Sequence, residues 1–178
     1  MYLIVGLGNP GKKYEHTRHN FGFAALDLLV SGQAWESKYH CEFLKLDDVI
    51  LAKPQTFMNN SGTAVREIMK FYPDAELIVV HDELDLPLGS LRVQKNVSAA
   101  GHNGVQSIID ELGTQNFISV RLGIESIERG ETPGDAFVLQ PFTAAEQTAY
   151  KEILERAKSA VETLQTDGLE LAQSKFNG

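Results

Sequence analysis

The chain has little of what several protein classes require. It has one cysteine among 178 residues, so no internal disulfide can form, as is usual in a reducing cytoplasm. No apolar run approaches the ~20 residues that a membrane-spanning helix needs. The N-terminus opens on a strand-like segment, residues 2–5, without the basic start or cleavage site of a secretion signal. We therefore expect a cytoplasmic protein that does not contact membranes.

Positive charge is also scarce. The sequence has 16 Lys and Arg against 24 Asp and Glu, which gives a net charge of −8. A protein that coats nucleic acid without sequence preference is usually basic. The charge therefore disfavours that function, although it leaves room for a local basic patch.

Several motifs of metal and nucleophile chemistry are missing. The histidines show no H-E-x-x-H or Cys/His spacing, so we predict no metal site and no organic cofactor. No G-x-S-x-G elbow is present, which disfavours a Ser-His-Asp hydrolase. The single cysteine, Cys41, lies in an alternating apolar stretch and is interpreted as a strand residue rather than a nucleophile.

Hydrophobic periodicity predicts one domain over residues 1–178, long enough for a sizeable core. Since the strands do not alternate strictly with helices, we predict a single α/β domain with a mixed, mostly parallel sheet flanked by helices. The expected strands are 2–7, 39–46, 49–53, 77–81, 91–95 and 117–124, and the expected helices begin near residues 20, 60, 103 and 143.

Turn and cap residues set the expected boundaries. Asn20 is a predicted N-cap for a helix that closes near Gly32, and residues 60–61 can cap a helix that ends before Pro73. The strand 77–81 is expected to end at Asp82. Residues 143–146 form a capping box for a helix that ends at residues 167–168, before a short tail.

Residues 6–11 satisfy the pattern G-x-G-x-x-G after a strand, which invites a dinucleotide-binding interpretation. Pro10 removes one backbone donor from the turn, and the residues that follow Gly11 are polar rather than an apolar helix. No second strand ends in an acid about 20 residues further on, because Asp27 falls within a predicted helix. We therefore favour a tight glycine turn and keep nucleotide binding as an alternative.

Three short polar segments lie at predicted strand-to-helix or strand-to-loop junctions: residues 17–20, 81–85 and 101–104. Such junctions meet at one edge of an α/β sheet, where ligands bind. A carboxylate at Asp82 could fix the tautomer of His19 and leave its other nitrogen free to accept a proton. Within 81–85 the sequence does not decide which acid faces the site. Asn59 has no evident structural role, and Asn103 is either an N-cap or a donor beside an oxyanion.

The chain resembles the bacterial peptidyl-tRNA hydrolase family across essentially its whole length. The resemblance is carried by five collinear segments, residues 5–11, 17–20, 54–62, 81–87 and 101–104. It implies a monomeric enzyme that cleaves the ester between a peptide and the 3′ ribose of tRNA, without metal.

The same resemblance assigns roles to individual residues. It implies that His19 is the base and Asp82 its carboxylate partner, with amides such as Asn9 stabilising the tetrahedral intermediate. It implies contacts between tRNA phosphates at the acceptor stem and 3′ end and two cations, Lys95 and Arg121. The further residues expected to bind substrate are Tyr14, Met58, Asn59, His102 and Asn103.

The chain departs from the family pattern on its tRNA-facing side. The family usually has a glycine-rich stretch before residue 101, but residues 94–100 of this chain contain no glycine. Ser119 stands where the family usually has an arginine. We interpret Lys95 as supplying the positive charge that the family usually has at the position of Gln94. These departures keep open a second alternative, a family member that binds RNA without turnover.

Overall fold

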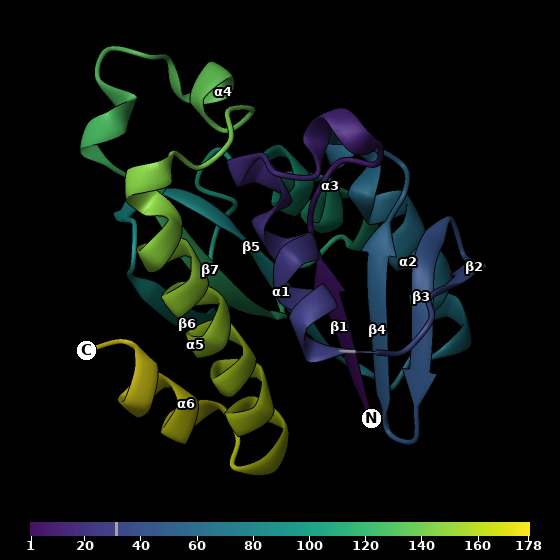
Figure 1. The fold of residues 1–178 in the computed structure, drawn as a ribbon. Coiled ribbons are helices and arrows are strands. Elements are labelled where there is room, and N and C mark those ends of the chain that lie inside the picture. Colours follow the sequence, from purple (N-terminus) through teal and green to yellow (C-terminus); the bar gives the residue numbers. More distant parts are fainter. Residues whose placement is uncertain (31) are drawn as a thin grey trace.

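A computed structural model describes residues 1–30 and 32–178, and Figure 1 shows a sheet with helices on both faces. The strands are β1 (Tyr2–Gly6), β2 (Glu36–Lys38), β3 (Cys41–Leu46), β4 (Val49–Pro54), β5 (Glu76–Pro87), β6 (Leu91–Lys95) and β7 (Ile118–Glu125). The α-helices are α1 (Phe21–Leu29), α2 (Ser61–Phe71), α3 (Asn103–Leu112), α4 (Gly134–Phe137), α5 (Gln147–Thr166) and α6 (Leu169–Phe176). Single 3-10 turns are η1 (Lys12–Tyr14), η2 (Arg18–Asn20), η3 (Met58–Asn60), η4 (Ile127–Arg129) and η5 (Ala144–Glu146).

The seven strands form one sheet in the order β2-β3-β4-β1-β5-β7-β6. β1 pairs in parallel with β4 and with β5, and β5 pairs in parallel with β7. β3 and β6 run against their neighbours. Five strands therefore point one way and two the other, which confirms the predicted mixed, mostly parallel sheet.

Alternation along the central strands divides the core between two faces. On β1, Ile4 packs with α1, α5 and α6, whereas Leu3 and Val5 pack with α2 and α3. Both faces are covered, so the central strands are apolar on both sides, as parallel strands usually are. Cys41 is buried in β3, and burial raises the pKa of its thiol to about 12. Its interpretation as a strand residue is confirmed.

The element predictions are wrong at several boundaries. β5 does not end at Asp82 but continues to Pro87, so the acids of residues 82–85 lie within a strand. The side chains of Asn20, Asn60 and Ser61 make no cap hydrogen bond. The predicted C-terminal tail is the helix α6. Helix α1 ends at Leu29, and residue 31 of the predicted helix lies outside the described residues.

Candidate functional site

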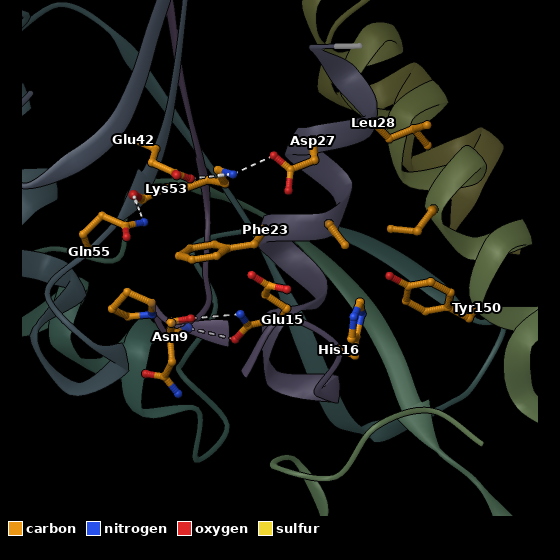
Figure 2. A pocket seen from close by; sticks show the side chains of 15 residues that line it. Asn9, Glu15, His16, Phe23, Asp27, Leu28, Glu42, Lys53, Gln55 and Tyr150 are labelled. Atoms are coloured by element: carbon orange, nitrogen blue, oxygen red, sulfur yellow. Dashed lines mark hydrogen bonds and ion pairs between the residues drawn. The ribbon is translucent and has the colours of Figure 1, made fainter. Parts of the chain in front are cut away.

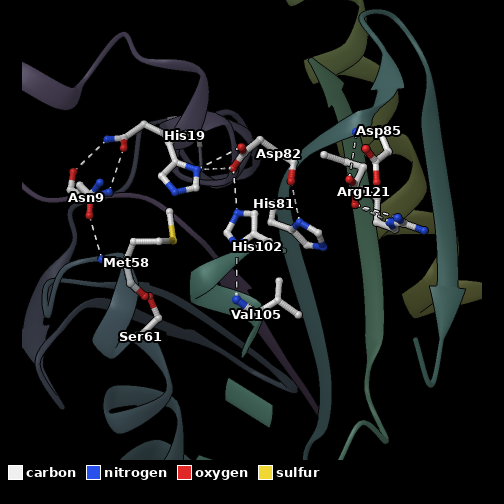
Figure 3. A network of polar contacts seen from close by, with 12 residues as sticks. Asn9, His19, Met58, Ser61, His81, Asp82, Asp85, His102, Val105 and Arg121 are labelled. Carbon is white, nitrogen blue, oxygen red and sulfur yellow. Dashed lines mark hydrogen bonds and ion pairs between the residues drawn. The ribbon is translucent and has the colours of Figure 1, made fainter. Parts of the chain in front are cut away.

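The site lies at the carboxyl end of the parallel strands, where β5 runs past the loops that follow β1 and precede α3. Asp82 of β5 pairs in register with Leu122 of β7. His19 comes from the 3-10 turn η2, just before α1, and His102 is the N-cap of α3. Chain segments about 60 and 20 residues away from Asp82 thus meet at one carboxylate, as Figure 3 shows.

Asp82 is shared by two imidazoles. Nδ1 of His19 lies 3.0 Å from both carboxylate oxygens, and Nε2 of His102 lies 2.9 Å from Oδ1. The three side chains are buried or nearly so. The sequence left open which acid of 81–85 faces the site, and the structure places Asp82 there.

Hydrogen-bond partners determine the tautomers. The backbone N–H of Val105 donates to Nδ1 of His102, 3.3 Å away, so that nitrogen carries no proton. His102 is therefore neutral and donates its Nε2–H to Asp82. His19 also faces the carboxylate with Nδ1, which leaves its Nε2 as the basic nitrogen. That nitrogen makes no hydrogen bond within the described chain, and His19 lines two cavities.

Electrostatics favour a protonatable His19. Burial alone would lower the pKa of His19, but the charge and the hydrogen bond of Asp82 outweigh it and raise that pKa above 6.5. Burial would raise the pKa of Asp82, yet the two histidines hold it far below its usual range. Burial lowers the pKa of His81 to about 3, so His81 stays neutral. The carboxylate is thus permanently charged beside a histidine that can take a proton.

A second set of groups is arranged around Asn9. The backbone N–H and C=O of Asn9 bond the side chain of Asn20, at 2.8 and 2.9 Å. The Oδ1 of Asn9 accepts from the N–H of Met58 at 2.8 Å, which fixes the amide orientation and leaves its NH₂ group as the available donor. Asn20 therefore holds Asn9 in place instead of capping a helix.

Glycine permits the close approach of α3 to this region. A Cβ at Gly104 would lie 2.4 Å from the sulfur of Met58, closer than any relaxed contact. Packing thus explains Gly104, whereas Gly101 has open space around it and a positive φ of 82°. His102, and not Asn103, caps α3, so the alternative of an Asn103 cap is wrong and its exposed amide has no cap role.

Two cavities meet at His19. One, of about 200 Å³, contacts Asp82 and His102 and has the acids of residues 83 and 85 on its wall. The other, of about 300 Å³, extends past Asn9. Both contact Asn103 and Val138. The other predicted substrate-binding residues that line the second cavity are Tyr14, Met58 and Asn59.

The two predicted phosphate-binding cations lie in different places. Arg121, at the level of His81, donates from Nε and Nη2 to Glu83, at 2.9 and 2.7 Å, and from Nη1 to Gln94. Its charge is therefore paired. Lys95 pairs with Glu76 at the opposite end of the sheet, so the structure does not bring Lys95 to this site.

A third cation, Arg92, was not among the residues predicted to bind phosphate. It is exposed, lies directly opposite Arg121 on neighbouring β6, and has no hydrogen bond or ion pair among the described residues. The sequence signal was present, because residues 91–95 alternate as a strand with one polar face.

A larger cavity of about 620 Å³ lies on the other side of Asn9 and Asn20, around α1. Figure 2 shows Lys53 between Asp27 and Glu42, each carboxylate 2.6 Å from the ammonium nitrogen. The cavity contacts neither His19 nor Asp82. Its central charges satisfy one another.

One group in the described part of the chain has metal-ligand geometry: ligand atoms of His19, Asp82 and His102 lie within 4.8 Å of one another. The two imidazole nitrogens concerned already lie at hydrogen-bond distance from the carboxylate. Hydrogen bonding accounts for this arrangement without an ion. That the reaction requires no metal stays a prediction. No described helix has the length and apolar character needed to cross a membrane.

The turn at residues 6–11 does not lead into a long helix. Gly11 precedes a single 3-10 turn, Lys12–Tyr14. A pyrophosphate in a dinucleotide fold sits at the N-terminus of a full α-helix. The geometry thus disfavours the dinucleotide interpretation.

Comparison with known proteins gives a consistent result. The model of the family described as "Peptidyl-tRNA hydrolase" matches residues 3–178. The chain is 46% identical to the peptidyl-tRNA hydrolase of Alkaliphilus metalliredigens, with 100% of both chains covered, and 43% identical to that of Nocardia farcinica, with 98% and 95% covered. A crystal structure of peptidyl-tRNA hydrolase from Acinetobacter baumannii superposes with a TM-score of 0.87 at 32% identity, over 100% of this chain and 95% of that one.

Proposed function

The chain belongs to the peptidyl-tRNA hydrolase family and hydrolyses the ester bond of peptidyl-tRNA, and we propose that His19 performs this reaction by activating water. The observation that carries the proposal is the Nδ1 contact of His19 with Asp82, which leaves Nε2 open to two cavities. A carboxylate-held imidazole of this kind is a general base suited to neutral pH.

The proposed reaction moves one proton out and back. Nε2 of His19 takes a proton from water as the water oxygen attacks the ester carbonyl, which gives a tetrahedral intermediate. Collapse breaks the bond to the ribose 3′ oxygen, and the imidazolium of His19 returns the proton to that oxygen. The products are a peptide with a free carboxyl group and a tRNA with a free 3′ hydroxyl. Asp82 stabilises the imidazolium between the two steps without titrating.

The amides surround the reaction centre as donors. The NH₂ of Asn9 has its direction fixed by Met58, so it can bind a peptide carbonyl or the developing oxyanion without competing as a base. Asn59 and Asn103 line the same cavity and are proposed to bind the peptide. Tyr14 and Met58 supply its aromatic and apolar wall, and His102 supports Asp82 as a neutral donor.

Binding of the tRNA is proposed to rest on few cations. Arg92 and Arg121 lie side by side across β6 and β7, near the end of β5 that carries Asp82. They are suited to the phosphates of the acceptor stem and 3′ end, with Arg92 as the freer charge because Glu83 pairs with Arg121. Lys95 has no place in this proposal because it lies at the far end of the sheet.

The proposal is tested with one tRNA in two forms, carrying an N-blocked or a free amino acid. The purified chain, with and without prior exhaustive chelation, should release the N-blocked amino acid much faster than the free one and retain full activity after chelation. Binding of the tRNA without release would favour the alternative of an RNA-binding family member. Restoration of a chelated sample by one divalent ion, beyond effects on tRNA folding, would contradict the metal-free step.

The resemblance to the family also implies a cytoplasmic monomer. Size-exclusion chromatography with light scattering, at concentrations above and below those of the assay, tests the monomer.

A further inference from the structure

The turn that carries His19 is bonded to a segment far along the chain. The N–H of His19 donates to the carbonyl of Val138 at 2.8 Å, and the N–H of Arg18 donates to that of Gln140 at 3.0 Å. Thr17 and Pro141 form an isolated antiparallel bridge. Because Val138 lines both cavities beside His19, these bonds join the proposed base to one wall of the cleft.

The side chain of Arg18 strengthens this joint. It is only 1% exposed, and its Nη1 donates to the carbonyls of Gln140 and Pro141 at 3.2 and 2.6 Å. Its Nη2 lies 2.5 Å from a carboxylate oxygen of Glu146, and the guanidinium lies 4.0 Å from the ring centroid of Phe137. One planar group thus contacts three parts of the segment at once.

Glu146 joins the two ends of the same segment. Its Oε1 accepts from the hydroxyl of Ser126 at 2.5 Å, and its Oε2 accepts from the N–H of Thr143 at 2.7 Å. Residues 126–143 are the excursion between β7 and α5 that includes α4 and stands above the sheet in Figure 1. The buried pair Arg18–Glu146 therefore lies at the base of this excursion and directly beside the turn of His19.

We propose that Arg18 is a positioning residue for the reaction, and that its pair with Glu146 fixes His19 and the wall at Val138 relative to each other. This inference rests on the proposed role of His19 as the base. If the pair were lost, Nε2 of His19 and the wall that borders both cavities could shift independently. A displacement of about 1 Å in a reaction centre can cost roughly 100-fold in rate.

The energetics of the pair favour positioning over stability alone. Nε of Arg18 is buried without a hydrogen-bond partner in the described part of the chain. A buried charge with an unsatisfied N–H is a costly means of stabilising a fold, and apolar replacements of such pairs are often neutral or stabilising. What apolar side chains could not reproduce is the fork that holds two carbonyls and a carboxylate in one geometry.

The test compares Arg18→Met, Glu146→Gln and the double variant Arg18→Met/Glu146→Gln. Each single change leaves one buried charge without its partner, so both should melt at lower temperature. The double variant removes both charges and should recover most of that loss. Positioning predicts that kcat for N-blocked aminoacyl-tRNA falls roughly tenfold to 100-fold in Arg18→Met and stays low in the double variant, with KM nearly unchanged.

Two parallel variants separate the explanations. Lys53→Met removes another nearly buried, doubly paired cation, which lines a cavity that His19 does not contact, and should lower the melting temperature while leaving kcat unchanged. His19→Ala tests the proposed base itself. If the double variant recovered kcat together with its melting temperature, Arg18 would serve the fold alone and the inference would be wrong. If His19→Ala stayed active, the proposed base would fail instead.

Discussion

Two charged clusters of opposite design lie around a buried group, Lys53 in one and Asp82 in the other. In the larger cavity Lys53 is shared by two carboxylates, and in the smaller one Asp82 is shared by two imidazoles. The ammonium group of Lys53 is held between both carboxylates. Around Asp82, a neutral donor satisfies one side of the carboxylate, while His19 retains a nitrogen without a partner in the described chain.

With His19 as the proposed base, the largest of these three cavities is not the one that carries the chemistry. The cavity of about 620 Å³ contains an ion-pair network around Lys53, whereas the cavities of about 200 and 300 Å³ meet at His19, whose Nε2 makes no hydrogen bond in the described chain. A satisfied network stabilises structure, and an oriented group with spare bonding capacity can react. The following predictions test this contrast.

The largest expected effect is that of His19→Ala. Removing the proposed base should lower kcat by roughly 10²–10⁴-fold, and the melting temperature should also fall, because the buried carboxylate of Asp82 loses one of its two imidazole partners. Hydrolysis of N-blocked aminoacyl-tRNA checks the rate, and a thermal melt checks the fold. A variant that kept half of the activity would show that His19 is not the base.

Asp82→Asn should lower the rate about 10–10³-fold. The hydrogen bond from Val105 fixes the tautomer of His102, so the amide oxygen of the introduced side chain would accept from Nε2–H of His102. The amide NH₂ group would then point toward Nδ1 of His19. That contact favours the tautomer with the proton on Nε2, the nitrogen that must be basic. Asp85→Asn, a nearby acid on the same cavity wall, is the matched comparison. If Asp85→Asn lost more activity than Asp82→Asn, the assignment of this role to Asp82 would be wrong.

Arg92→Ala should raise KM several-fold for a full peptidyl-tRNA and leave a minimal peptidyl-adenosine ester unaffected. Loss of one phosphate contact should flatten the salt dependence of binding by about 0.7–0.9 in the log–log slope. Arg121→Ala should act in the same direction but also destabilise the fold, since it leaves Glu83 buried without its partner. Lys70→Ala, an exposed cation on α2, is the control. Equal losses on both substrates would contradict the phosphate role.

The smallest effect on catalysis is expected from Lys53→Met, in the cavity of about 620 Å³. The melting temperature should fall by roughly 2–8 °C, because two carboxylates lose their shared cation. A substantial fall in kcat at unchanged stability would show that the larger cavity takes part in the reaction.

Apolar periodicity predicted the strands of the sheet except β2, whose three residues are all exposed and carry no apolar signal. The sequence could not choose among the acids of 81–85, since it placed them after a strand that in fact continues to Pro87. Successive strand residues point to opposite faces, and here Asp82 faces His19 whereas Glu83 binds Arg121.

The sequence could not predict long-range polar pairs, and the reason is different. Arg18 and Glu146 are 128 residues apart and carry no local signature of their pairing. Asn20 resembled an N-cap, and only the fold shows that its side chain bonds Asn9. Local patterns predict elements, whereas the partners of a polar side chain depend on which segments the topology brings together.

The central claim, that Asp82 tunes His19 as the base, is tested most directly by the pH dependence of kcat/KM in wild type and Asp82→Asn. A base must be neutral, so activity falls as the pH drops through the pKa of His19 in the free enzyme. Because Asp82 raises that pKa above 6.5, the acid limb of the wild-type profile should have its midpoint above 6.5. It should move to lower pH in Asp82→Asn, where burial acts alone. Identical midpoints in the two proteins would contradict the account.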